Sequence, residues 1–251
     1  MTAWTLVLLA LAQGAEGTPA RVVVCPGDYG GHLQGLATDA DLNIYWSFTV
    51  QLVKTDREGG LLKVVDVPTH HGDLAWVDGK VYVAVNLGRF NEEPGQADSW
   101  VYVYDAEDLS LLAKHPVQEA VHGAGGMDHR DGAFFVVGGL PEDYGENYVY
   151  EYDGDFRFVK RHVVASGHTH LGIQTAAWLD GNWWFGCYED RLGLLQTDAD
   201  FQVLGRHDPS FALGIAAWED GQCLLGASPR TPDGKRHTGT ATITRLPGRS
   251  W

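Results

Sequence analysis

Apolar residues occur along this chain in short runs that alternate with polar and glycine-rich turns. Four such runs directly follow Asp-Gly pairs, at residues 78–79, 131–132, 180–181 and 220–221. Asp and Gly accept the backbone angles of a tight hairpin turn, and short runs rich in Val, Phe, Tyr and Trp favour strands. No stretch shows the spacing of an amphipathic helix. The pattern predicts an all-β protein.

A longer unit repeats around these hairpins. It begins with a polar linker that often contains histidine, and it continues through two strands joined by the Asp-Gly turn. A third and a fourth strand follow, and the third ends in Asp in four copies, at Asp56, Asp105, Asp153 and Asp198. A period of roughly 40 to 50 residues with four strands is typical of β-propeller blades. We count five copies and predict a five-bladed β-propeller over residues 21–251.

The last copy lacks a fourth strand, whereas a spare strand at residues 21–25 precedes the first copy. We expect this N-terminal strand to complete the last blade, because closing the ring removes open sheet edges. The other fourth strands are expected at residues 61–67, 109–114, 156–161 and 201–205. Three long polar insertions are expected as surface loops between second and third strands, at residues 86–99, 139–147 and 228–237.

Residues 1–20 resemble a signal peptide. An apolar run at residues 4–12 is too short to span a bilayer, and small residues follow it. A buried first strand is the alternative interpretation, because no Lys or Arg precedes the run. The signal predicts a secreted or periplasmic protein. Cys25, Cys187 and Cys223 are expected as buried free thiols, the alternative being one disulfide with one thiol left over.

The formal net charge of −15 bears on the partners. Nucleic acids and anionic membranes are bound by clustered Lys and Arg, so neither is expected as a partner. The chain is expected to be a monomer that binds a small molecule or an oligosaccharide.

Histidines are concentrated in the linkers between blades. Seven of the eleven lie there: His32, His70, His71, His122, His168, His170 and His207. Because the starts of the inner strands converge on the axis of a propeller, we predict one divalent transition metal (Zn, Mn, Fe, Cu or Ni) there. The predicted ligands are His32, His71, His122 and His170. Alternative ligands, or groups that orient the ligands, are His70, His168, Gln174 and Asp73. The competing interpretation is a set of structural histidines that hydrogen-bond to the backbone and to water.

Tyr188, Glu189 and Arg191 follow a second strand with almost no loop, so they are predicted as the catalytic groups. They would handle protons or bind charge while the metal polarises a carbonyl or carboxylate. The polar rim suits a carbohydrate-like substrate, and the reaction is expected to be that of a lyase or a hydrolase. A non-catalytic ligand-binding propeller is the alternative.

Two short motifs carry a family resemblance. Residues 34–37 (Gln-Gly-Leu-Ala) and 72–75 (Gly-Asp-Leu-Ala) are similar to the start of the plant-type glutaminyl cyclases, which are five-bladed. That resemblance implies acyl transfer, with Asp73 at the position of a catalytic glutamate. At the level of the fold, the chain resembles five-bladed propellers of exported bacterial proteins. The histidine ring is similar in kind to the sites of metal-dependent propeller enzymes such as oligogalacturonate lyases and carotenoid oxygenases.

Overall fold

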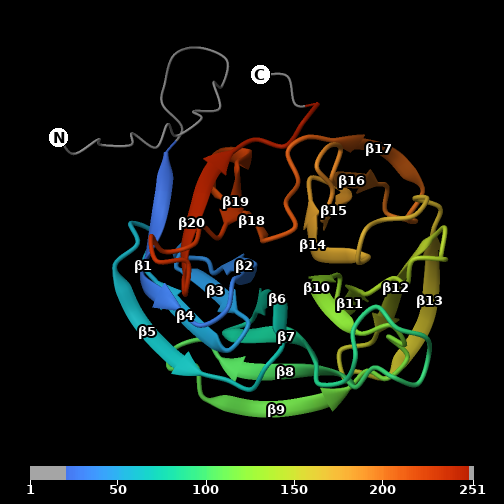
Figure 1. The fold of residues 1–251 in the computed structure, drawn as a ribbon, viewed down its shortest axis with the longest axis horizontal. Coiled ribbons are helices and arrows are strands. Elements are labelled where there is room, and N and C mark those ends of the chain that lie inside the picture. Colours follow the sequence, from blue (N-terminus) through green and yellow to red (C-terminus); the bar gives the residue numbers. More distant parts are fainter. Residues whose placement is uncertain (1–20, 249–251) are drawn as a thin grey trace.

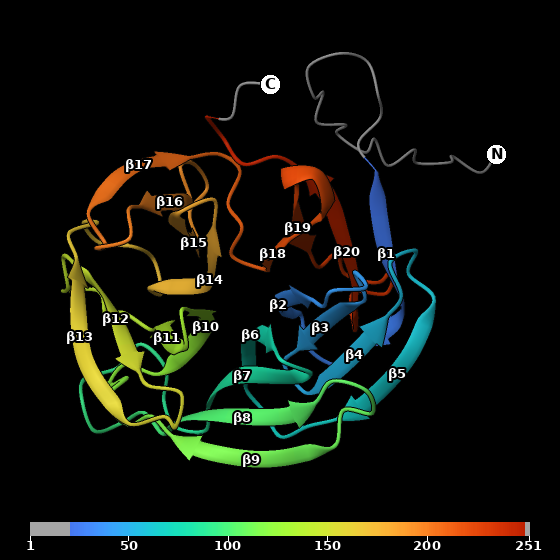
Figure 2. The same ribbon diagram turned by 180° about the vertical axis from the view of Figure 1, so that it is seen from behind.

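Five antiparallel sheets of four strands each are arranged as a ring around a central axis (Figure 1). The computed structural model describes residues 21–248, so the expected signal at residues 1–20 lies outside the described residues. The inner strands are β2, β6, β10, β14 and β18, and they surround the axis in both views (Figure 2). The predicted five-bladed β-propeller is confirmed.

Each of the first four blades is built from four consecutive strands, with the inner strand first. From the inner to the outer strand, the blades comprise β2 (Leu33–Thr38), β3 (Ile44–Phe48), β4 (Gln51–Thr55) and β5 (Leu61–Asp66); β6 (His71–Val77), β7 (Lys80–Asn86), β8 (Ser99–Asp105) and β9 (Leu111–Pro116); β10 (Ala124–Arg130), β11 (Ala133–Gly138), β12 (Asn147–Tyr152) and β13 (Phe158–Val164); and β14 (Ile173–Leu179), β15 (Asn182–Cys187), β16 (Leu194–Thr197) and β17 (Val203–His207).

The two ends of the chain share the fifth blade, as predicted. Its order is β18 (Ile215–Ala217), β19 (Cys223–Ala227), β20 (His237–Thr244) and β1 (Val22–Tyr29). Val24 of β1 pairs with Thr240 of β20. An ion pair between Asp28 of β1 and Arg236, the residue before β20, joins the same two segments. The N-terminal strand therefore closes the ring.

The local turn signals account for the blades. Asp78 and Gly79 have φ values of 47° and 75° and form a two-residue turn between β6 and β7. Such angles are costly for most residues but are tolerated by Asp and Gly. The Asp that ends the third strand caps the next turn, because Asp153 Oδ1 accepts hydrogen bonds from the backbone N–H groups of Asp155 and Arg157.

Three of the fourth strands begin two residues later than predicted. Leu109, Phe156 and Phe201 were expected as their first residues, but they have positive φ values of 59°, 59° and 64° and belong to the turn. All three side chains are buried. They pack into the clusters between neighbouring blades. Each of these turns thus contains a buried apolar residue. In the sequence such a residue looks like the first residue of the strand that follows, which explains the shift of two positions.

The hydrophobic core lies between the blades, in five clusters that join each sheet to the next. The first cluster packs Val23 and Cys25 of β1 against Trp46 and Phe48 of β3, which seals the closing blade to its neighbour. The three cysteines are buried free thiols, as predicted. Among residues 21–248 there is no helix with the length and apolar character needed to cross a membrane.

Candidate functional site

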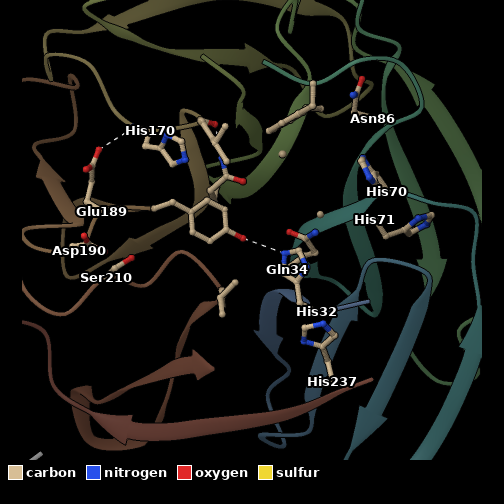
Figure 3. A pocket seen from close by; sticks show the side chains of 18 of the residues that line it. His32, Gln34, His70, His71, Asn86, His170, Glu189, Asp190, Ser210 and His237 are labelled. Carbon is tan, nitrogen blue, oxygen red and sulfur yellow. Dashed lines mark hydrogen bonds between the residues drawn. The ribbon is translucent and has the colours of Figure 1, made fainter. Parts of the chain in front are cut away.

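A cavity of 780 Å³ lies where the linkers between blades meet the loops between second and third strands (Figure 3). The linkers contribute His170 and Leu171 before β14, and the loops contribute Phe90 after β7. The cavity thus lies among the linkers and insertions that were predicted from the sequence. Five histidines line it: His32, His70, His71, His170 and His237.

His32 and Tyr188 form a hydrogen-bonded pair inside this cavity, with Nε2 and Oη 3.2 Å apart. Figure 3 marks this contact with a dashed line at His32. Burial lowers the pKa of His32, and the nearby His237, His70 and Arg230 lower it further. The imidazole is therefore neutral near pH 7 and able to accept a proton. Burial also raises the pKa of Tyr188 to about 12, so its phenol keeps its proton.

Two carboxylates line another wall. Glu189 Oε1 accepts a hydrogen bond of 2.9 Å from the backbone N–H of His170, which fixes that side chain against the linker before β14. Asp190 and Ser210 lie beside it, on the opposite side of the cavity from His70 (Figure 3). These oxygens are placed to accept hydrogen bonds from hydroxyl groups of a ligand.

Basic groups gather at the end of the cavity near His32. The rings of His32 and His237 have centroids 5.9 Å apart. Arg230 is paired with His237 through an isolated backbone bridge, and its Nη1 donates a 3.0 Å hydrogen bond to Gly234 O. No ion pair joins Arg230 to a carboxylate within residues 21–248. Its charge is therefore available to a ligand.

Two of the four predicted metal ligands have other partners. His71 is completely buried, with Nδ1 2.7 Å from Pro68 O and Nε2 2.7 Å from Tyr104 Oη. Burial lowers the pKa of His71 to about 4, so both ring nitrogens are engaged in a neutral ring. His122 Nδ1 lies 2.8 Å from Glu92 O, and this ring does not line the cavity.

The predicted set of His32, His71, His122 and His170 is therefore not brought together. Within residues 21–248, no three side chains of His, Cys, Asp or Glu are grouped so that they could hold a metal ion. His32 and His170 both line the cavity, but a stable metal site in a protein usually needs at least three ligands. The described residues therefore do not fit the four-histidine arrangement.

The other predicted site residues divide between the cavity and its surroundings. Tyr188 and Glu189 line it, whereas Arg191 is exposed outside it. His168 is also outside, with Nδ1 3.0 Å from Tyr144 O. Gln174 lines the cavity, but its amide donates a 2.5 Å hydrogen bond to Leu171 O, so it shapes the linker.

Asp73 does not line the cavity and is completely buried. Its Oδ2 accepts a 3.0 Å hydrogen bond from the backbone N–H of Ala176, which ties β6 to β14. Burial raises the pKa of Asp73 well above its usual value. Asp128 makes a similar tie to Trp178 N at 2.6 Å, and burial raises its pKa to about 7. These carboxyl groups link inner strands, so Asp73 is not placed to act on a substrate as the cyclase resemblance implies.

Several residues of the cavity were not among the predicted site residues, and His237 and Phe90 are two of them. His237 begins β20, a third strand, whereas the prediction considered the linkers to inner strands. The feature of the sequence that could have indicated it is the position of His237 at the end of the 228–237 insertion. Phe90 packs over Gly123 and Gly125, where a Cβ atom at Gly123 would lie only 2.3 Å from the Phe90 ring. Glycine is needed there to let the aromatic ring form an apolar wall.

Comparisons with known proteins agree with this architecture. No protein-family model and no curated protein matches the chain, so no similarity to glutaminyl cyclases is found. Among solved structures, the chain is similar to the RS223 β-xylosidase, with 14% identity and a TM-score of 0.60 over 92% of this chain and 97% of that chain. It is also similar to a gluconolactonase from Xanthomonas campestris, with 14% identity and a TM-score of 0.50 over 89% and 90%. Both likenesses show the propeller fold.

Proposed function

We propose that this propeller is an enzyme that cleaves a carbohydrate-like polar substrate, as a hydrolase or a lyase, by acid–base chemistry in the cavity. The observation that supports this most is the contact between His32 and Tyr188, which places a neutral imidazole beside a protonated phenol. A base and an acid that share one cavity and keep opposite protonation states are what general acid–base catalysis requires.

The pair can move one proton in a complete cycle. His32 Nε2 takes a proton from a water molecule in hydrolysis, or from a carbon next to a carboxylate in elimination. Tyr188 gives its proton to the departing oxygen as the bond to that oxygen breaks. His32 lies 3.2 Å from the phenol, so it returns the proton to Tyr188 and both groups are restored. Throughout this cycle, Glu189 holds hydroxyl groups of the substrate in position.

The shape of the cavity and the structural neighbours add support for a sugar. Phe90 and Leu213 give apolar surface, while Glu189 and Asp190 give hydroxyl acceptors. Pockets for sugars combine these two kinds of surface. The β-xylosidase and the gluconolactonase act, by their names, on sugar compounds, and this chain shares their fold.

A non-catalytic binding propeller is the second candidate. It is favoured by three histidines that bond to backbone carbonyls in the manner of structural groups, His71 to Pro68, His122 to Glu92 and His168 to Tyr144. Such a protein would bind its ligand in the same cavity and release it unchanged.

The test is incubation of the purified protein with a panel of neutral and acidic oligosaccharides, with the products identified by mass spectrometry. Hydrolysis adds the mass of water across the broken bond, whereas elimination adds none and leaves a carbon–carbon double bond. Tyr188→Phe is expected to lose turnover, and His115→Asn, on the outer strand β9, is the matched control that should retain it. Binding without any product would favour the binding propeller.

The divalent transition metal is a separate proposal. Elemental analysis of protein purified without chelators would support it if one of Zn, Mn, Fe, Cu or Ni is present in a stoichiometric amount. Its ligands would then include His32 or His170, since both rings line the cavity. A metal-free protein whose melting temperature does not respond to these ions would overturn it.

A further inference from the structure

The charges that line the cavity are separated into two groups. Glu189, Asp190 and Ser210 lie together on one side, while His32 and His237 lie together away from them (Figure 3). Arg230 belongs to the second group, because its backbone is bridged to that of His237 and its charge lowers the pKa of His32. The cavity is therefore basic at one end and acidic on another wall.

The charge of Arg230 is not neutralised by a carboxylate of the described residues. The protein has 33 acidic residues against 18 Lys and Arg, and several of its arginines form ion pairs. Arg57, for example, pairs with Glu219, and Arg157 pairs with Asp153 and Asp155. Arg230 lines the cavity without such a pair among the described residues. Its free guanidinium N–H groups are donors for an anionic ligand.

We infer that the substrate is an acidic sugar, whose carboxylate binds at Arg230 and His237 while its hydroxyl groups face Glu189 and Asp190. The inference rests on the proposed function, because it names the substrate class of the same cavity. A uronate unit carries both kinds of group at opposite ends of one ring. With the carboxylate at Arg230, the ring is held beside His32, whose Nε2 already contacts Tyr188.

A carboxylate fits this end better than a phosphate. A guanidinium can form two parallel hydrogen bonds to a carboxylate or to a phosphate, so the rest of the site decides between them. Phosphate sites usually add a helix N-terminus or a run of backbone N–H groups in a glycine-rich loop. The helical element within residues 21–248 is the single turn Glu219–Gly221, and it does not line the cavity.

The experiment is isothermal titration calorimetry of the full chain with short uronate oligomers, each paired with the neutral oligomer of the same linkage. The uronates are expected to bind at least about tenfold more tightly than their neutral partners. Arg230→Gln should weaken uronate binding by about ten- to a hundredfold and leave neutral binding unchanged. Arg89→Gln is the matched control, since Arg89 is an exposed arginine on the loop between β7 and β8 of the second blade and does not line the cavity.

The outcomes separate this inference from the proposed function. Equal binding of neutral and acidic oligomers, no uronate binding, or uronate binding that survives Arg230→Gln would each overturn the acidic-sugar assignment. Tighter binding of a sugar phosphate than of any uronate would overturn it as well. Uronate binding without turnover would overturn the enzyme and leave the ligand class standing. Turnover of neutral sugars alone would overturn the acidic-sugar assignment and leave the enzyme standing.

Discussion

His32 Nε2 lies 3.2 Å from Tyr188 Oη, although the two residues are 156 positions apart in the chain. One precedes the inner strand of the first blade, and the other follows the second strand of the fourth blade. The ring arrangement of the blades brings the two residues together. Proton transfer at this pair predicts a particular dependence of the rate on pH.

With a substrate from the oligosaccharide panel, kcat/KM should fall on the acid side, with a midpoint below about 6.5, the ordinary histidine value. The reason is that burial lowers the pKa of His32, and the base must be neutral to act. No alkaline limb from Tyr188 is expected up to about pH 10, because the pKa of its phenol is raised to about 12. An acid limb centred above pH 7 would contradict the assignment of His32 as the base.

His71→Asn should destabilise the protein. The ring is completely buried and bridges Pro68 O and Tyr104 Oη, so its loss leaves buried groups unpaired. Chemical denaturation is expected to show a loss of about 2 kcal/mol or more in the free energy of unfolding. His70→Asn, at the exposed neighbouring position, is the control and should change it by less than about 0.5 kcal/mol. Equal effects of the two variants would show that the ring of His71 is not a structural tie.

The contrast between His70 and His71 shows where the sequence was insufficient. The repeat predicts a histidine at the start of β6, and the sequence offers two, His70 and His71. Which of the two side chains points into the blade depends on which residue begins the strand. His71 starts β6 and its ring contacts Tyr102 and Tyr104 of the same sheet, whereas His70 is exposed at the cavity. A difference of one position reverses the direction of a side chain in a strand. Sequence spacing alone does not resolve it.

Other parts followed from local signals. The Asp-Gly hairpins and the Asp caps are encoded within a few residues, so the blade count and the closure by residues 21–25 could be predicted. The place of Tyr188 and Glu189 near the cavity could be predicted because almost no loop separates them from β15. His237 and Arg230 reach the cavity through a long insertion in the last blade, and the path of such a loop depends on contacts far away in the chain.

Removal of residues 21–25 should lower the melting temperature by at least about 10 °C. Val23 and Cys25 are buried in the cluster between the first and last blades, and β1 supplies the outer strand of the closing sheet. Thermal unfolding followed by circular dichroism measures the effect. A double substitution of the exposed Val22 and Val24 by Thr is the control that keeps the strand, and it should cost far less. An unchanged melting temperature after the deletion would contradict closure by β1.

Asp128→Asn should change how stability depends on pH. Burial raises the pKa of Asp128 from 3.8 to about 7 in the folded protein, so the folded state binds the proton more tightly than the unfolded state. The contribution of this group is therefore greatest below pH 3.8 and is lost as pH rises through about 7. Asn does not titrate, so the stability of the variant relative to the wild type should increase from about pH 4 to about pH 8. Denaturant titrations at several pH values measure this difference, and a constant difference would contradict the raised pKa.

The most direct test of the proposed chemistry is the initial rate of His32→Asn beside that of the wild-type protein, on the same substrate and at equal concentrations of folded protein. Removal of the base is expected to reduce kcat by about 10²- to 10⁴-fold. The melting temperature should change little, because His32 is only partly buried at the cavity. A variant that turns over substrate at the wild-type rate would contradict catalysis by the His32 and Tyr188 pair.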